Sequence, residues 1–485
     1  MKINPVKFGT SGHRGIIGET FKPDHIQAIA YAVSKFLGKE TPSPSIVIGY
    51  DPREGNSPSL EENSFTKLLV DTLLDQGVNV YYYDTYVPTP LISKHIIQFS
   101  LQGGLILTAS HNPPEYNGIK FNPKNGAPAP ELITKEIESI ANSVLEKELP
   151  QSKEKGSLTL LSETTWFSKE LITLISNWFP ETSISHSTVI CDTKYGTCAP
   201  VWKTIFESLQ LKNYELVNSE PRSDFGGIEP NPTNTEGLKD LMQKVTLNNA
   251  SIGISNDPDG DRFSIVDDLG EQLIPEEATA IITDYLIQRG LPVTEIVTTV
   301  ASSGIVKAVT SLNNLSYNET AVGFKHFAPF LETAKNKSEL SFGVESSGGL
   351  TCSLHTMEKC GFLPGLCLLY IMADSKKSLS ELKMACLEKY GKFSFQETSA
   401  TFDNDQKETI VKTLNSAELK SLSPLFSKPI SKLDKTDGLK VIFDNNDWVL
   451  IRLSGTEPLA RLYSESKNET DANQYLIEAK TLFLH

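Results

Sequence analysis

Short apolar runs that end in a polar loop and precede a helical segment recur along this chain. The run at 46–51 leads into a helix, the run at 188–192 precedes a helical segment at 198–209, and the run at 295–300 precedes one at 304–310. Strands that alternate with helices build parallel or mixed sheets with helices packed on their faces. The pattern therefore predicts three weakly similar α/β domains.

The remaining pattern sets the expected boundaries. A β-rich run at 78–83 and a short strand at 104–107 continue the first unit, and Ser59 with Glu62 predicts a capping box for a helix through Leu74. Polar segments at 149–156, 267–270 and 391–401 are candidate linkers. We expect α/β domains at 1–150, 151–270 and 271–390, and a smaller α+β domain without the repeat at 391–485.

Composition narrows the possible partners. The 485 residues include 45 Lys and Arg against 60 Asp and Glu, a net charge of −15, which argues against nucleic acid or a membrane as partner. The six Cys form no CxxC pair, so we expect reduced thiols in a cytoplasmic protein. The first residues lack the apolar stretch of a signal peptide, and the most apolar segment, 361–373, is too short to span a bilayer.

The segment Thr-Ala-Ser-His-Asn-Pro-Pro at 108–114 follows the strand at 104–107. Asn-Pro and Pro-Pro mark loops, so Ser110 is predicted to lie on a loop at the end of a strand. Such a serine is either an ordinary surface residue or a nucleophile that a neighbouring group must activate. No GxSxG elbow surrounds it, which argues against an α/β-hydrolase.

The loop Asp-Pro-Asp-Gly-Asp-Arg at 257–262 places three carboxylates at alternate positions. Asp257, Asp259 and Asp261 can converge on one hard cation, and Mg²⁺ prefers such oxygen ligands. An EF-hand is disfavoured, because the glycine stands at position 4 of the loop and not at position 6, and position 12 is Asp268 and not glutamate. Two other interpretations stay open, namely an acidic turn that caps a helix and the nucleophile loop of a haloacid-dehalogenase-type phosphatase.

Three further loops suit phosphate or sugar ligands. Arg452-Leu-Ser-Gly-Thr-Glu-Pro, with Arg461 downstream, offers guanidinium groups and hydroxyls to phosphate oxygens. The loop at 343–349 offers the carboxylate of Glu345 and two hydroxyls to a sugar. The loop at 9–15 joins glycines to a cation. Taken singly, the Arg452 loop is equally compatible with a solvated basic turn, the loop at 343–349 is better explained as an ordinary turn at the end of a strand, and the loop at 9–15 is a weak signal.

In this order the loops resemble the α-D-phosphohexomutase family of phosphoglucomutases and phosphomannomutases. The matching pieces are FGTSGHRG (8–15), TASHNPPEYNGIKF (108–121), DPDGDR (257–262), VGFKH (322–326), ESSGG (345–349) and RLSGTEPLARLY (452–463). The resemblance implies four domains around a central cleft, three of them related mixed-sheet α/β domains. It also implies Mg²⁺ as cofactor and a small phosphosugar as substrate, in a monomer or homodimer.

The resemblance also implies a role for each matching residue. Ser110 would be a phosphoserine whose phosphate joins Asp257, Asp259 and Asp261 on Mg²⁺. Arg14 and Arg262 would stabilise that phosphate, and His111 and Lys120 would be candidates for acid–base work. Lys325 would contact the substrate, and Glu345 and Ser347 would bind the sugar hydroxyls. The residues that would bind the non-reacting phosphate are Arg452, Ser454, Gly455, Thr456 and Arg461.

Two positions depart from the family pattern. Val344 precedes Glu345 where many members have glycine, and Gly349 stands where some relatives have a catalytic histidine, so that role is not carried over. The loop sequences are more similar to the glucose and mannose branch than to the phosphoglucosamine branch. The implied reaction interconverts hexose 1-phosphate and hexose 6-phosphate through a hexose 1,6-bisphosphate. The alternatives are a phosphopentomutase, an Mg²⁺-dependent sugar phosphatase and a non-enzymatic sugar-phosphate-binding regulator.

Overall fold

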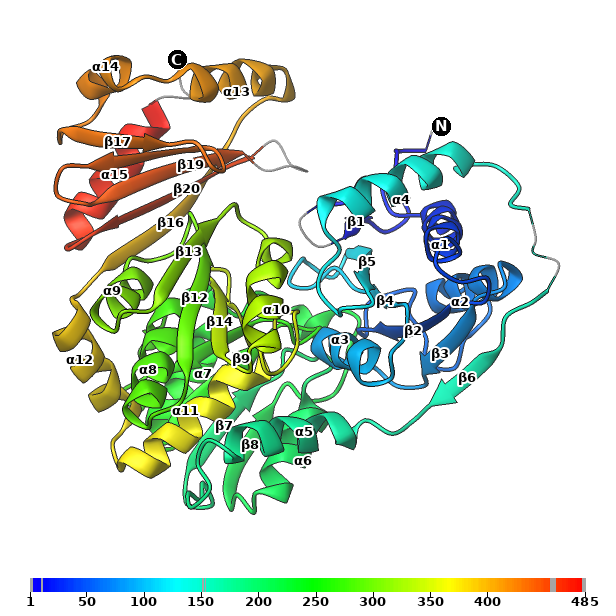
Figure 1. Ribbon diagram of the computed structural model, residues 1–485, viewed down its shortest axis with the longest axis horizontal. Helices are drawn as coiled ribbons and strands as arrows, with labels where there is room; N and C mark the ends of the chain where they lie inside the picture. The colour runs from blue at the N-terminus through cyan, green and yellow to red at the C-terminus, as the bar shows by residue number, and fades with distance from the viewer. Residues whose placement is uncertain (1–2, 10–11, 151, 153, 454–458, 482–485) are drawn as a thin grey trace.

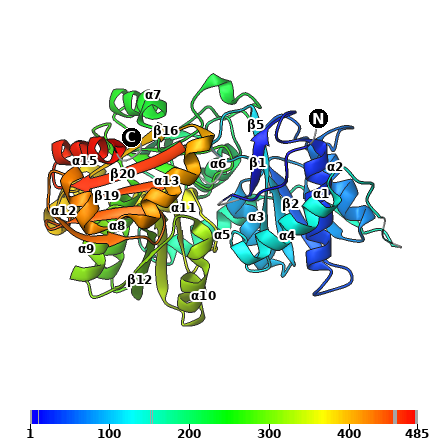
Figure 2. The same cartoon turned by 90° about the horizontal axis from the view of Figure 1, so that it is seen from above.

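The chain forms four sheets that follow one another along the sequence, as a computed structural model describes for residues 3–9, 12–150, 152, 154–453 and 459–481. Figure 1 shows the first sheet with its helices in blue and cyan on one side and the last sheet in orange and red on the other. The view from above in Figure 2 shows the same separation, with the blue and cyan elements at the right and the orange and red elements at the left.

The first domain is a six-stranded mixed sheet of order β1-β5-β4-β2-β3-β6. Strands β2, β3, β4 and β6 run parallel, and β5 runs antiparallel to both of its neighbours. Strands β2 and β4 are buried almost throughout, as expected for parallel strands covered on both faces. The strands are β1 (His13–Ile16), β2 (Ser45–Tyr50), β3 (Asn79–Tyr83), β4 (Gly103–Leu107), β5 (Tyr116–Pro123) and β6 (Leu158–Leu161), and the helices are α1 (Pro23–Leu37), α2 (Phe65–Asp75), α3 (Thr89–Gln98) and α4 (Glu131–Val144).

The second and third domains repeat the centre of the first sheet. The order β5-β4-β2-β3 recurs as β10-β9-β7-β8 and as β15-β14-β12-β13, each time with three parallel strands and an antiparallel fourth. The predicted repeat of three α/β domains is thereby confirmed. The second domain contains α5 (Thr165–Ser176), β7 (Thr188–Asp192), α6 (Ala199–Ser208), β8 (Asn213–Val217), α7 (Thr235–Leu247), β9 (Ile252–Asn256), β10 (Phe263–Val266) and β11 (Gln272–Leu273). The third contains α8 (Pro275–Gln288), β12 (Val293–Thr299), α9 (Ile305–Leu312), β13 (Ser316–Thr320), α10 (Ala328–Asn336), β14 (Leu340–Glu345), β15 (Gly349–Cys352), α11 (Phe362–Ser375) and α12 (Leu379–Tyr390).

The fourth domain has a different sheet, antiparallel throughout, of order β16-β20-β19-β18-β17. It has a hydrophobic core of its own, which includes Leu439, Val449 and Tyr475. The predicted smaller α+β domain is confirmed. Its elements are β16 (Ser394–Thr401), α13 (Lys407–Ser416), α14 (Leu419–Leu422), β17 (Ile430–Asp434), β18 (Leu439–Phe443), β19 (Trp448–Leu453), β20 (Leu459–Ser466) and α15 (Glu469–Thr481).

Two local predictions differ from the structure. Helix α2 begins at Phe65 with Ser64 as its cap, not at Ser59, because Leu60 and Asn63 adopt left-handed backbone conformations that a helix cannot contain. The segment 391–401, predicted as a linker, is largely strand β16. Among the described residues, no helix is both long enough and apolar enough to cross a membrane.

The repeat also fixes where the conspicuous loops lie. In each of the three related domains the parallel strand next to the antiparallel strand turns back into it, at β4–β5, β9–β10 and β14–β15. The first of these turns contains Ser110, the second contains Asp257–Arg262, and the third contains Ser347, with Glu345 ending the strand before it. Three separate sequence motifs thus lie at one equivalent position of a repeated fold.

Candidate active site

Ser110 lies at the start of the β4–β5 turn in an uncommon backbone conformation. Its φ of 54° is left-handed, which costs a residue with a Cβ about 1 kcal/mol, so neighbouring contacts must hold it there. Its N–H donates to Thr108 Oγ1 at 2.8 Å. The side chain is buried, and its Oγ donates to Asp257 Oδ2 at 2.7 Å. The turn therefore aims the hydroxyl at the loop of the second domain.

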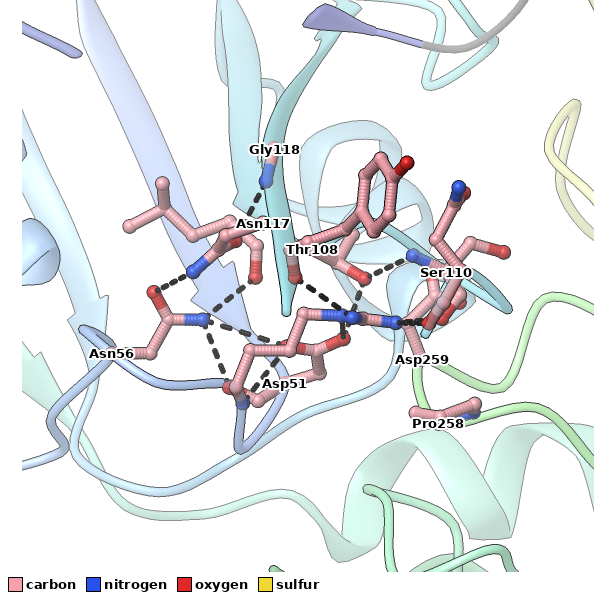
Figure 3. Close-up of polar contacts among 12 residues, drawn as sticks. Asp51, Asn56, Thr108, Ser110, Asn117, Gly118, Pro258 and Asp259 are labelled. Carbon is pink, nitrogen blue, oxygen red and sulfur yellow. Dashed lines mark hydrogen bonds and ion pairs between the residues drawn. The ribbon is translucent and has the colours of Figure 1, made fainter. Parts of the chain in front are cut away.

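A buried ion pair below the turn holds this conformation. Asp51, just after the end of β2, accepts from Thr108 Oγ1 at 2.6 Å and from Arg53 Nε at 3.1 Å, and both charged side chains are wholly buried. Figure 3 shows Asp51 and Thr108 in one network with Ser110 and Asn56. The Arg53 guanidinium donates to four backbone carbonyls of the turn, those of Ser110, Asn112, Pro113 and Tyr116. One guanidinium thereby fixes the shape of the whole turn.

The carboxylates of Asp257, Asp259 and Asp261 converge in the β9–β10 turn. One oxygen of each lies within 4.8 Å of the others, and all three side chains are buried. Gly260 has a φ of +67° within this turn, and a Cβ there would lie 2.9 Å from Cys198 Sγ and from Pro88 Cβ. Only glycine allows the loop to reverse so tightly that three carboxylates face one point.

The donor set of this turn fits a hard cation. Among the described residues, Asp259 Oδ1 and Asp261 Oδ1 are buried without any hydrogen-bond partner. Burial and the two neighbouring carboxylates raise the pKa of Asp257 well above its usual range. A buried group of carboxylates with unsatisfied oxygens is stabilised by a bound divalent cation, and Mg²⁺ prefers oxygen ligands of this kind.

Lys120, on β5, enters the same turn. Its Nζ lies 2.6 Å from Asp259 Oδ2 and 2.7 Å from Asp261 Oδ2. Burial disfavours the charge on Lys120, but the two carboxylates outweigh it and raise the pKa of the ammonium group. Thr89, at the start of α3, donates to Asp259 Oδ2 at 2.6 Å. The first domain therefore supplies donors to one oxygen of each of these two carboxylates.

Arg14, Arg262 and His111 add positive charge and a ring nitrogen beside Ser110. Arg14 Nη1 donates to Asn112 Oδ1 at 2.7 Å, and burial together with the charge of Arg262 lowers the pKa of Arg14 to about 10. His111 Nδ1 lies 3.4 Å from Ser110 Oγ. Burial, followed by the charges of Arg262 and Arg14, holds the pKa of His111 well below its usual range. These contacts bring the predicted cations to the serine turn.

The sugar-loop candidates lie beside the metal loop. Arg262 Nη1 donates to the Ser347 carbonyl at 3.3 Å, and the N–H of Phe263 donates to the Gly348 carbonyl at 2.9 Å. Glu345 is buried and accepts from the N–H of Gly323 at 2.9 Å. Lys325 is half-buried in the short 3-10 turn Phe324–His326 that follows Gly323. The second and third domains therefore join their functional turns by direct hydrogen bonds.

Lys359 is a site residue that the sequence did not reveal. Its buried Nζ lies 3.4 Å from Asp261 Oδ2 and 3.1 Å from Glu358 Oε1. Its side chain passes over Gly349, where an added Cβ would lie 2.4 Å from Lys359 Cδ. Lys359 thus fills the space beside Gly349 and supplies a cation to the metal loop from the third domain.

The fourth domain contributes two arginines from neighbouring strands. Arg452 on β19 and Arg461 on β20 are directly opposite in the antiparallel register, so both side chains lie on one face. Arg452 Nε lies 2.6 Å from Asp437 Oδ2, and Arg461 Nη1 lies 3.3 Å from Glu397 Oε1. The charge of Arg461 reaches His111 and helps to lower its pKa. The other predicted residues of this loop, Ser454, Gly455 and Thr456, lie outside the described residues.

Comparison with known proteins places this site in a family. Models of the phosphoglucomutase/phosphomannomutase alpha/beta/alpha domains I, II and III match residues 5–148, 169–270 and 275–390, and that of the C-terminal domain matches 404–479. The chain belongs to the phosphoglucomutase/phosphomannomutase family. A Thermococcus kodakarensis phosphoglucomutase/phosphomannomutase is 31% identical over 475 residues, which cover 97% of this chain and 96% of that protein.

Solved structures of phosphomutases share the fold of this family member. A Thermus thermophilus protein assigned as a phosphomannomutase has a TM-score of 0.82 at 24% identity, with all of both chains covered. An Aspergillus fumigatus N-acetylphosphoglucosamine mutase, solved with GlcNAc-6P and magnesium, has a TM-score of 0.62 at 14% identity and covers 99% of this chain and 95% of its own. These structures show the shared fold, and the family models together with the 31% identical relative show that this chain is an enzyme of the phosphoglucomutase/phosphomannomutase family.

The family motifs did not include the supporting residues of the site. Asp51 and Arg53 stand in the segment Gly-Tyr-Asp-Pro-Arg, which the sequence marks only as a strand that leads into a loop. An Asp-x-Arg pair directly after an apolar strand was the signal available for them. Lys359 has no such signal, because its partner Asp261 belongs to another domain.

Proposed function

We propose that this family member is a phosphohexomutase that interconverts hexose 1-phosphate and hexose 6-phosphate, with glucose or mannose as the sugar. The observation that carries the proposal is the 2.7 Å hydrogen bond between Ser110 Oγ and Asp257, one of three buried aspartates that converge. A serine placed against such a cluster suits phosphoryl transfer, where positioning and charge neutralisation dominate catalysis.

In the proposed reaction, phosphorylated Ser110 gives its phosphoryl group to the hydroxyl of a bound sugar monophosphate. The bond between phosphorus and Ser110 Oγ breaks, a bond to the sugar oxygen forms, and the product is a hexose 1,6-bisphosphate. Its other phosphoryl group then returns to Ser110, which leaves the isomeric monophosphate. Mg²⁺ held by Asp257, Asp259 and Asp261 would neutralise charge that develops between the donor and acceptor oxygens.

The chain's own residues divide the remaining work. Arg14 and Arg262 bind the phosphoryl group at Ser110 and hold its oxygens in place. The hydroxyl proton passes to a basic group within hydrogen-bond reach. The 3.4 Å distance from Ser110 Oγ to His111 Nδ1 supports His111 over Lys120, whose ammonium is engaged by two carboxylates. Deprotonated Ser110 Oγ is stabilised by the same cations when it is the leaving group.

Binding of the sugar falls to the third and fourth domains. Glu345 and Ser347 accept from the sugar hydroxyls, with Lys325 on the neighbouring turn. Arg452 and Arg461, opposite one another on β19 and β20, grip the phosphate that does not react. Because this grip is made by a separate domain, the intermediate can be bound with either of its phosphates at Ser110.

The direct test replaces the nucleophile. Ser110→Ala should reduce conversion of glucose 1-phosphate to glucose 6-phosphate, in the presence of glucose 1,6-bisphosphate, by more than about a thousandfold. Ser143→Ala, at an exposed position of α4, is the matched control and should retain full activity. Phosphopeptide mapping should find phosphate on Ser110 in the wild type and none there in the variant. Normal mutase activity of Ser110→Ala would refute the mechanism.

A second test separates mutase from phosphatase and defines the sugar. Chelation should abolish activity and Mg²⁺ should restore it, whereas activity that is indifferent to chelator would contradict the role of the aspartates. Initial rates with glucose, mannose, N-acetylglucosamine, glucosamine and ribose 1-phosphates measure the preference. Steady release of inorganic phosphate from these substrates would instead indicate a phosphatase that uses Asp257 as nucleophile.

A further inference from the structure

Asp437 joins the phosphate-binding domain to the sugar-binding domain. It lies in the turn between β17 and β18 of the fourth domain. Its Oδ2 accepts from Arg452 Nε at 2.6 Å and from the backbone N–H of Val322, in the third domain, at 3.0 Å. One carboxylate oxygen therefore receives a donor from each of the two domains.

The Val322 contact leads directly to the sugar loop. The next N–H along the chain, that of Gly323, donates to Glu345 Oε1 at 2.9 Å. Two successive backbone donors thus hold two carboxylates, Asp437 on one side and Glu345 on the other. A continuous path of charge-assisted hydrogen bonds runs from Arg452 through Asp437 and residues 322–323 to Glu345.

The surroundings make this path a rigid one. Strand β18 begins two residues after Asp437, and Lys440 on it donates to the Val300 carbonyl and to Glu319 Oε1 of the third domain, each at 2.8 Å. A buried hydrophobic cluster lies between the two domains and contains Val300, Ala301, Trp448, Leu450 and Tyr463. Asp437 therefore lies at the margin of a packed interface, with its side chain 24% exposed and one carboxylate oxygen engaged by both domains.

We propose that Asp437 is a positioning residue that orients Arg452 for phosphate and sets its distance from Glu345. Because Asp437 engages Nε, the guanidinium meets a phosphate through its terminal nitrogens Nη1 and Nη2, the pair that forms two parallel hydrogen bonds. The proposal rests on the proposed function, since it treats Arg452 as the ligand of the non-reacting phosphate. It adds that the sugar carboxylate and the phosphate clamp are held in register by one side chain.

The test is the substitution Asp437→Asn, which keeps the size and removes the charge. The clamp binds the non-reacting phosphate in the ground state and in the transition state alike, so its loss raises KM and leaves kcat unchanged. We expect KM for the sugar phosphate to rise roughly tenfold, because one charge-assisted hydrogen bond is lost. We expect kcat to stay within about twofold of the wild type. Asp444→Asn, on the exposed turn between β18 and β19, is the matched control and should change neither constant.

A double variant tests whether Asp437 acts through Arg452. Arg452→Lys lacks Nε, so adding Asp437→Asn to it should change KM by less than about twofold. A further tenfold rise in KM in the double variant would overturn the proposal. An unchanged KM in Asp437→Asn alone would also overturn it, whether or not kcat is reduced.

Calorimetric titration of glucose 1-phosphate into Ser110→Ala, with and without Asp437→Asn, measures the same difference without turnover. A wild type that lacks mutase activity refutes the proposed function, whereas an equal affinity of the two titrated variants refutes the role of Asp437.

Discussion

Replacing Arg53 with methionine should disorder the Ser110 turn while the other domains keep their structure. The substitution retains an unbranched apolar stem and removes the guanidinium. It leaves Asp51 wholly buried without its counter-ion, and it leaves the carbonyls of residues 110, 112, 113 and 116 without their donor. Ser110 would then lose the contact that holds its carbonyl in the left-handed conformation.

The size of the effect follows from these contacts. Removing one partner of a buried ion pair costs about 3–5 kcal/mol, because an uncompensated charge remains. An exposed pair contributes only about 0–1 kcal/mol. Arg222 and Asp224 provide that comparison, since they pair at the same spacing of two residues with side chains 50% and 59% exposed. Arg222→Met is therefore the matched control for Arg53→Met.

Hydrogen exchange measured by mass spectrometry resolves the effect locally. A loss of about 4 kcal/mol in local opening free energy accelerates exchange roughly a thousandfold, and we expect this in peptides that cover 108–121. Peptides from β18 and β19 in the fourth domain should exchange at the wild-type rate. Asp51→Asn in the Arg53→Met background should recover most of the protection but not the mutase activity, since the turn still lacks its four donors. Wild-type exchange of 108–121 in Arg53→Met would refute this reasoning.

Three further outcomes are expected. Burial raises the pKa of Glu276 to about 7 from 4.5, with the Glu465 and Glu277 carboxylates adding to it. The folded protein therefore binds the proton of Glu276 more tightly than the unfolded chain does. This preference stabilises the fold fully below pH 4.5, and the stabilisation is lost as the pH rises to about 7. Thermal unfolding from pH 4 to 8 should show Glu276→Gln gaining up to about 3 kcal/mol over the wild type at high pH, whereas Glu388→Gln, on the exposed face of α12, should show no such gain. Gly349→Ala should displace Lys359, because the new Cβ would lie 2.4 Å from Lys359 Cδ, and kcat should fall roughly tenfold. Gly237→Ala on α7 is the control. An unchanged kcat in Gly349→Ala would exclude Lys359 from the reaction. Lys359→Met should lower kcat at least as much as Gly349→Ala, and a smaller loss would contradict the displacement of Lys359 as the cause.

The sequence predicted the features that depend on neighbours along the chain. The apolar runs in β2 and β7 mark parallel strands, because strands covered on both faces are mostly apolar. In β12 only Ile296 and Val297 form such a run, and the repeat along the chain supplied the rest of the signal. The turns with Ser110 and Asp257 were visible because proline and glycine punctuate them. The start of α2 was not, because Ser59 with Glu62 matches the capping-box pattern, whereas Ser64, which caps the helix, is followed by Lys67 at the corresponding position. The left-handed backbone at Leu60 and Asn63 prevents the helix from starting at Ser59.

Apart from the contact of Ser110 with the aspartate loop, which the family motifs implied, contacts between domains had no signal in the sequence. Lys359 and Asp261 come from different domains, as do Asp437 and Val322. Their pairing follows from how the domains pack, and an isolated lysine or aspartate in a sequence is usually a solvated surface residue. The contacts of Arg53 were only partly predictable from the sequence. Its ion-pair partner Asp51 is two residues away, but the carbonyls to which it donates belong to a distant turn.

The repeated fold explains why the reaction is divided among the domains as we propose. Each related domain places one turn between its antiparallel strand and the neighbouring parallel strand, so three copies bring a serine, a carboxylate cluster and the proposed sugar-binding carboxylate together. The hydrogen bonds from Arg262 to Ser347 and from Ser110 to Asp257 lock these turns together. A fourth domain of the same fold would place its turn among these three and be joined to them by similar hydrogen bonds. The antiparallel fourth domain has its own core and meets the third through a smaller cluster and the contacts of Asp437, so the phosphate clamp is built apart from the three joined turns. Because the clamp lies on a separate domain, it can bind whichever phosphate of the proposed intermediate is not at Ser110.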